Sequence, residues 1–225
     1  MIYDFHTHST LSDGELSPIE LIRRASVAGY RAVGVTDHAG IGALRRFAQE
    51  LGDHCALARA RWDITALPGV ELTHVPAAAV AEGARAAKEA GLWLVVVHGE
   101  TISEPVEKGT NLAAVSCPDV DILAHPGLIT REEAELAARN GVFLELSAKP
   151  NHCATNGHVA RMARLARASL IVDSDSHSLE FLTEEQARRI VLGAGLEEKD
   201  VEDILRVNPQ LLLERVLAAR VQRPA

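Results

Sequence analysis

Short apolar segments typical of β-strands alternate with amphipathic segments typical of α-helices along the whole chain. Strands are expected at residues 2–5, 32–36, 64–70, 93–97, 120–124, 142–146 and 170–172. Helices are expected at residues 17–28, 43–60, 78–90, 131–139, 158–168, 184–192 and 200–219. Strands that alternate with helices pair in parallel through right-handed crossovers. Seven such units predict an α/β protein with a closed or nearly closed barrel, and an open doubly wound sheet is the alternative.

Residues 1–225 are expected to form a single domain, because a chain of 225 residues suits one substantial core. The first predicted helix carries clear signals at both ends. Ser17 is a favourable N-cap, Pro18 suits the first helical position, and Glu20 predicts a capping box with Ser17. Gly29 is expected to end this helix.

The composition narrows the classes of function. A formal net charge of −8 argues against broad binding to nucleic acid, which requires a basic surface. The longest apolar run, at 92–97, is much shorter than a membrane helix, so no membrane partner is expected. The three cysteines are too scattered for a disulfide framework, and no signal peptide precedes the first strand. A reducing, cytoplasmic location is therefore expected.

The first strand ends in two histidines separated by one residue, His6 and His8. A strand alternates its side chains between its two faces, so both imidazoles point to the same side. Two imidazoles at one strand end can hold zinc, iron or manganese. Taken alone, the pair is equally well interpreted as two partly buried histidines.

Further side chains able to bind metals follow other predicted strands at or just beyond their carboxyl ends. They are His38, Glu71, His98, His125, Asp175 and His177, and Asp13 lies in the loop after the first strand. The carboxyl ends of parallel barrel strands share one face, where the active sites of such barrels lie. This repeated placement favours one common metal centre over separate, structurally buried histidines.

The number of these residues is itself informative. A closed zinc site needs four ligands and a catalytic one needs three plus water, whereas nine candidates are present here. Nine ligands suit two or three divalent ions, and Glu71 is the natural bridging carboxylate because it has two oxygens. Two ions about 3.5–4 Å apart can generate a hydroxide and stabilise both the attacking and the leaving oxygen.

These motifs resemble, in order, those of the PHP family, the polymerase and histidinol phosphatase domain. The matching segments are His6-x-His8, Ser12-Asp13-Gly14, Thr36-Asp37-His38, Gly69-Val70-Glu71, His98, Ala124-His125-Pro126 and Ser174-Asp175-Ser176-His177. The resemblance implies a distorted (β/α)7 TIM-like barrel that holds a trinuclear site. It implies zinc, manganese or iron as the metal, and aspartate at position 13 favours manganese or iron over zinc.

The resemblance also implies how the ligands divide. One ion would lie on His6, His8, Glu71 and Asp175, a second on Glu71, His98 and His125, and a third on Asp13, His38 and His177. Glu71, Asp175 and His177 are the residues expected to be catalytic. The implied reaction is hydrolysis of a phosphate ester of a small metabolite, as in histidinol phosphatase, by metal-bound hydroxide. Independently of the resemblance, Asp4 and Asp37 are candidates to orient ligand imidazoles, with an ordinary turn or solvated carboxylate as the alternative for each.

Three residues outside the motifs are candidates for binding substrate. Lys149 follows the sixth strand, Arg131 follows the fifth, and His158 opens a helix. Lys149 is equally well interpreted as a solvated lysine, the alternative for Arg131 is an ordinary place in the first turn of a helix, and a first-turn histidine such as His158 is more often an ordinary surface residue. His74 and His152 are interpreted as ordinary polar residues, with a contact to substrate or ligands as the alternative.

A small phosphorylated substrate is the expected partner. The alternatives are a 3'-5' exonuclease or oligonucleotide phosphodiesterase, a non-catalytic PHP-like subunit of a larger assembly, and a metal-dependent hydrolase of non-phosphate bonds. Low basicity and few aromatic residues (4%) disfavour the nuclease, since single-strand binders use basic grooves and stacking rings. The intact set of ligand positions disfavours the non-catalytic subunit. The sequence fixes neither the substrate nor the oligomeric state.

Overall fold

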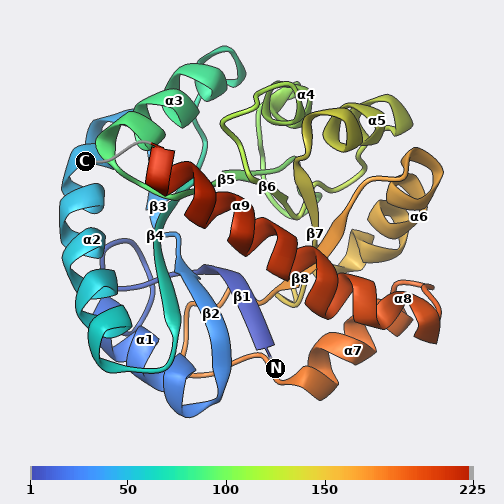
Figure 1. Ribbon diagram of the computed structural model, residues 1–225. Coiled ribbons are helices and arrows are strands. Elements are labelled where there is room, and N and C mark those ends of the chain that lie inside the picture. The colour runs from blue at the N-terminus through green and yellow to red at the C-terminus, as the bar shows by residue number, and fades with distance from the viewer. Residues whose placement is uncertain (1, 223–225) are drawn as a thin grey trace.

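Seven parallel strands form the central sheet of the computed structural model, which describes residues 2–222 (Figure 1). The strands are β1 (Ile2–Thr7), β2 (Tyr30–Val35), β4 (Thr65–Leu72), β5 (Leu94–His98), β6 (Ile122–Ala124), β7 (Phe143–Ser147) and β8 (Leu170–Asp173). Their spatial order is β1-β2-β4-β5-β6-β7-β8, so each strand pairs with the next along the chain. A short additional strand, β3 (His38–Ala39), pairs with β4.

The sheet curves into a nearly closed barrel whose two edge strands, β1 and β8, meet through a few specific contacts. Thr7 and Ser176 form an isolated parallel bridge. The Phe5 amide donates to Asp173 Oδ1 at 2.6 Å, and the Ser174 amide donates to Asp4 Oδ1 at 3.1 Å. Buried carboxylates thus replace part of the backbone ladder at this seam. The predicted distorted seven-stranded barrel is confirmed.

Helices follow the strands and cover the outside of the barrel. They are α1 (Pro18–Val27), α2 (Leu44–Arg61), α3 (Val80–Ala90), α4 (Thr110–Val115), α5 (Arg131–Asn140), α6 (Asn156–Ala166), α7 (Glu184–Gly193), α8 (Glu198–Glu202) and α9 (Asn208–Gln222). Among the described residues, none of these helices combines the length and the apolar character needed to cross a bilayer.

Apolar residues fill the barrel interior toward the amino ends of the strands. Phe5, Leu67 and Leu94 are fully buried there and belong to the same cluster as Leu212 and Leu213 of α9. Helix α9 lies across the strands in Figure 1 and so caps this end of the barrel. The buried histidines gather at the opposite end, where the strands finish.

The structure corrects three local predictions. No helix was expected between residues 97 and 120, but the structure has the short helix α4 there, whose N-cap is the left-handed Gly109. The helix expected at 200–219 is interrupted by a π-helical turn at Asp203–Val207. Ser17 makes no side-chain capping bond, and Glu20 pairs with Arg24 at 2.7 Å instead of completing a capping box.

Candidate metal centre

A cavity of about 610 Å³ opens at the carboxyl ends of the strands. Its wall includes seven side chains predicted as metal ligands or substrate contacts: Asp13, His38, His98, His125, Lys149, Asp175 and His177. His6, His8 and Glu71 lie fully buried beneath them. All nine predicted metal ligands therefore converge on one place, although they are separated by up to 171 positions in the sequence.

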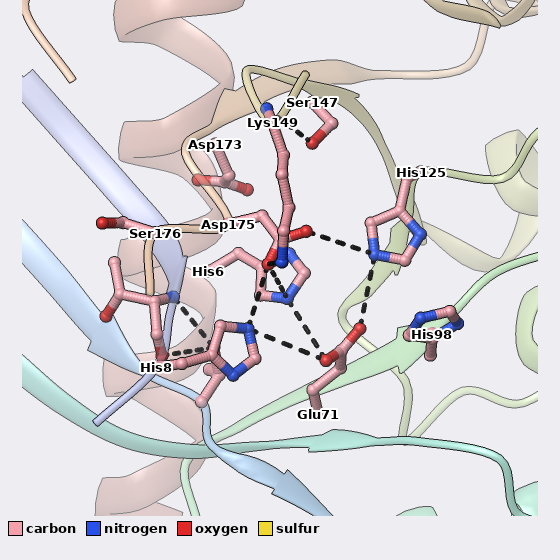
Figure 2. A network of polar contacts seen from close by, with 12 residues as sticks. His6, His8, Glu71, His98, His125, Ser147, Lys149, Asp173, Asp175 and Ser176 are labelled. Carbon is pink, nitrogen blue, oxygen red and sulfur yellow. Dashed lines mark hydrogen bonds and ion pairs between the residues drawn. The ribbon is translucent and has the colours of Figure 1, made fainter. Parts of the chain in front are cut away.

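The deepest part of the centre is formed by His6, His8, Glu71 and Asp175 (Figure 2). His6 Nε2 lies 3.4 Å from Glu71 Oε2, and His8 Nε2 lies 3.2 Å from Asp175 Oδ1. The two imidazoles point to the same side of β1, with ring centroids 5.0 Å apart. This is the arrangement predicted from the alternation of side chains along the first strand.

A second group forms at the mouth of the cavity, from Asp13, His38 and His177. Asp13 Oδ1 lies 3.6 Å from His38 Nε2 and 3.2 Å from His177 Nε2. Those two ring nitrogens are themselves 3.2 Å apart. The His8 ring stacks against each of the two imidazoles, with centroid distances of 4.1 and 4.0 Å.

The set predicted for the second ion, Glu71, His98 and His125, is less simple. His125 Nε2 lies 3.5 Å from Glu71 Oε1, so the two oxygens of Glu71 serve different groups. His98 packs edge-on against His125, and its Nε2 lies 3.1 Å from Glu104 Oε2. Asp175 is shared in the same way as Glu71, since Oδ1 faces His8 and Oδ2 faces His125 at 3.7 Å.

A buried carboxylate behind the centre, Glu145 on β7, orients His6. Its Oε2 lies 2.6 Å from His6 Nδ1, which leaves the other ring nitrogen aimed at Glu71 and Asp175. Ligand histidines are commonly held by such a carboxylate. Sequence reasoning did not identify Glu145, although a charged residue within the apolar strand Phe143–Ser147 was a usable signal.

Asp4 and Asp37 were predicted to orient ligand imidazoles, and the structure gives them other contacts. Asp37 accepts four hydrogen bonds, from the amide and hydroxyl groups of Ser9 and Ser12. It therefore fixes the loop that carries Asp13. Asp4 accepts from the backbone amides of His6 and Ser174, so it positions strand β1 rather than a ring nitrogen.

Backbone strain gathers at the same place. His74, His125 and Asp175 adopt positive φ angles of 51°, 28° and 51°, a region that disfavours residues other than glycine. Strained conformations of this kind persist only where the surrounding structure enforces them, and they cluster at functional sites. Gly127, at φ 59°, lies so close to Glu100 that a Cβ atom would meet its carbonyl oxygen at 1.9 Å.

Burial keeps several of these imidazoles neutral. It lowers the pKa of His8 well below its ordinary value, and it lowers the pKa of His98 and of His152 to about 4. Neutral imidazole is the form that binds a metal ion. These three rings are therefore available as ligands at neutral pH without losing a proton.

The carboxylates have the opposite effect on His6. Burial alone would lower its pKa, but the neighbouring Glu145, Glu71 and Asp175 outweigh burial and raise the pKa of His6 well above its ordinary value. For Glu71 the effects are reversed: burial would raise its pKa, but the surrounding histidines hold that pKa well below its usual range. The centre thus contains ionised carboxylates that need positive charge beside them.

The donor atoms fit divalent metal ions. His6 Nε2, both ring nitrogens of His8 and Glu71 Oε1 are buried without a hydrogen-bond partner. Buried polar atoms are normally paired, so a cluster of unpaired ones requires a partner such as a cation. Five sets of donor atoms lie mutually within 4.8 Å, among them His6, His8 and Asp175; His6, Glu71 and His125; and His8, Asp13, His38 and His177. Imidazole with carboxylate suits zinc, manganese or iron(II).

Of the three predicted substrate contacts, the structure brings Lys149 into the centre. Its Nζ lies 3.2 Å from Asp175 Oδ1 and 3.0 Å from His177 Nδ1. Arg131 is exposed and pairs with Glu135 at 2.8 Å, and His158 Nε2 contacts the Ile129 carbonyl at 2.8 Å. Neither Arg131 nor His158 is among the described residues that line the cavity, so their substrate roles stay predictions.

The fold and the centre together define a barrel of the metal-dependent hydrolase class. A family profile described as the PHP domain matches residues 4–94. The chain is 43% identical over 218 residues to an uncharacterized protein, MJ1295, of Methanocaldococcus jannaschii, covering 96% of this chain and all of that one. The chain belongs to the PHP family of metal-dependent phosphoesterases.

Two further comparisons bear on activity and fold. The chain is 26% identical over 234 residues to the DNA polymerase/3'-5' exonuclease PolX of Bacillus subtilis, covering 91% of this chain and 41% of PolX. The crystal structure of histidinol phosphate phosphatase from Lactococcus lactis, in complex with zinc, L-histidinol and phosphate, superposes with a TM-score of 0.61. That pair is 17% identical over 87% of this chain and 94% of the phosphatase, which is a likeness of fold.

Proposed function

We propose that the chain hydrolyses the phosphate ester of a small metabolite at this centre. The observation that carries the proposal is the place of Lys149. Its ammonium group lies at the wall shared by the metal-binding cavity and a second cavity of about 470 Å³. A fixed cation beside a polynuclear centre is suited to bind a phosphoryl oxygen.

The second cavity supports a small organic substrate. It shares Lys149, Asp175 and His177 with the first cavity, and Phe181, Leu182 and Ile190 give it a partly apolar wall. Small-molecule sites are typically concave and largely apolar, with a few polar groups that fix orientation. A phosphoryl group in the first cavity would leave the remainder of the ester to occupy the second.

The side chains of the centre have distinct roles in this reaction. When bound, two or three divalent ions of zinc, manganese or iron would supply Lewis acidity that lowers the pKa of water and neutralises phosphoryl charge. Glu71 and Asp175 each direct their two oxygens to different histidines, so each carboxylate would help to hold the ions. His177 and Asp13 would hold the outermost ion, nearest the incoming phosphate. Lys149 orients the ester through a phosphoryl oxygen.

Hydrolysis of oligonucleotide ends is a second candidate, favoured by the match to PolX along 91% of this chain. Two observations weigh against it. The net charge of −8 gives little attraction for a polyanion. Lys149 is the single lysine or arginine among the described residues that line the metal-binding cavity. A nuclease channel would require more positive charge and more stacking rings.

Phosphate release separates the two candidates. Purified protein loaded with manganese, zinc or iron(II) would be assayed against phosphorylated metabolites, histidinol phosphate included, and against short oligonucleotides. We expect release from a metabolite and little cleavage of the oligonucleotides. Glu71→Gln should abolish turnover, whereas His54→Ala, on the outer helix α2, should leave it unchanged. Cleavage confined to oligonucleotides would establish the second candidate, and full activity of Glu71→Gln would refute the assigned centre.

A further inference from the structure

His152 lies in the turn after β7 and is buried, with 3% of its surface exposed. Two hydroxyl groups from the loop after β5 hold its Nδ1, Thr101 Oγ1 at 2.8 Å and Ser103 Oγ at 3.0 Å. Its ring stacks on that of His125, with centroids 4.1 Å apart. These contacts fix the ring plane and direct Nε2 into the cavity.

The Nε2 atom of His152 meets other donor atoms there. It lies 3.7 Å from Asp175 Oδ2 and 3.5 Å from Glu104 Oε1. The second oxygen of Glu104 lies 3.1 Å from His98 Nε2, so this carboxylate spans the two imidazoles. One ring nitrogen each from His98, His125 and His152 lies within 4.8 Å of the others.

We propose that His152 is a metal ligand, and that it binds one divalent cation together with His98 and His125. Glu104 would supply an oxygen ligand to the same ion from the loop after β5. The predicted set for this ion contained Glu71, His98 and His125, so the inference adds two residues from two loops. It rests on the proposed function only for the presence of ions in the centre.

The contacts of Glu104 have the length expected between neighbouring ligands of one ion. Metal bonds to nitrogen or oxygen are about 2.1 Å long, so neighbouring ligands of a tetrahedral ion are separated by about 3.4 Å. The contacts of Glu104 with His98 and His152, at 3.1 and 3.5 Å, bracket that separation. A ligand histidine usually has its other ring nitrogen held by a hydrogen bond, as Thr101 and Ser103 hold His152.

The inference can be tested by counting ions, without any substrate. His152→Ala and native protein would be dialysed against Mn²⁺ or Zn²⁺, and bound metal measured by inductively coupled plasma mass spectrometry. A chelator competition would give the affinity of each ion. We expect His152→Ala to bind one ion at least tenfold more weakly and to keep the others. His54→Ala, a histidine removed from the outer helix α2, should match the native protein.

A second variant provides the test if His152→Ala does not fold. Glu104→Gln changes a side chain that is 36% exposed, and it should weaken the same ion while the circular dichroism spectrum stays native. Native metal content and affinity in both folded variants would overturn the inference. A higher KM for a substrate in those variants would then indicate that His152 contacts the substrate instead of an ion. Metal counts do not depend on turnover, so an inactive native protein that binds ions would refute the proposed function alone.

Discussion

Glu145 provides the sharpest single perturbation of the centre. Its carboxylate is fully buried and lies 2.6 Å from Nδ1 of His6, whose other ring nitrogen faces Glu71 and Asp175. Glu145→Gln keeps the size and shape of the side chain but removes its negative charge. The ring then loses a charge-assisted hydrogen bond, which contributes about 1.5–3 kcal/mol.

The expected magnitude follows from that bond. Outer partners of ligand histidines typically change metal affinity by about 10–100-fold, which corresponds to about 1.4–2.8 kcal/mol and agrees with the strength of the lost hydrogen bond. We therefore expect Glu145→Gln to weaken the ion held by His6 and His8 by about 10–100-fold. The fold should tolerate the change, because burial and the neighbouring Asp4 and Glu145 raise the pKa of Asp173, and Glu145→Gln removes one of these unfavourable contacts.

The assay is a titration of metal-free protein with Zn²⁺ or Mn²⁺ in competition with a chelator of known affinity. Urea unfolding of the metal-free protein measures stability separately. Glu135→Gln is the matched control, since Glu135 is a partly exposed helix residue paired with Arg131. An affinity within threefold of native for Glu145→Gln would refute the reasoning that His6 is a ligand oriented by this carboxylate.

Two further predictions concern Asp37 and the protons carried by the ligand histidines. Asp37→Asn should lower the free energy of unfolding, measured in urea, by about 1.5–3 kcal/mol, because Asp37 accepts four hydrogen bonds from Ser9 and Ser12. Unchanged stability and unchanged affinity for the outermost ion would contradict the role of Asp37 in holding the loop of Asp13. Metal binding at pH 6 should release protons, because the raised pKa values of His6, His38 and His125 leave these rings protonated in the metal-free protein. Metal affinity should therefore rise with pH. Calorimetry in buffers of different ionisation enthalpy measures this release, and identical heats in all buffers would contradict it.

The barrel could be predicted because the sequence patterns of its strands and helices are local. Apolar runs and amphipathic helices alternate in the chain, and parallel pairing places every strand end on one face. For that reason His98 and Asp175 could be assigned to one centre without coordinates. The first-strand pair, His6 and His8, became informative only when combined with the other strand ends.

Contacts between loops could not be predicted in the same way. Asp37 holds the loop of Asp13 through hydroxyl and amide groups that no periodic pattern links to it. Glu104 and His152 meet across two loops, 48 positions apart in the sequence. Such contacts depend on loop conformation, which side-chain hydrogen bonds and strained backbone angles determine jointly.

The short helix α4 was missed for a related reason. It has six residues and begins after Gly109 at φ 96°, so it carries neither a full amphipathic repeat nor a polar N-cap. The capping box predicted for Ser17 was wrong because Glu20 has a competing partner one helical turn away, Arg24. Local signals therefore located the elements but did not decide between alternative side-chain partners.

The central claim is that nine side chains, from the carboxyl ends of different strands and the loop after β1, form one polynuclear metal centre. Diffraction data collected at the absorption edge of manganese or zinc, from crystals of metal-loaded protein, test it most directly. We predict at least two anomalous peaks within bonding distance of the centre, one of them between His6, His8 and Asp175. A loaded protein whose anomalous peaks all lie outside the cavity would contradict the claim.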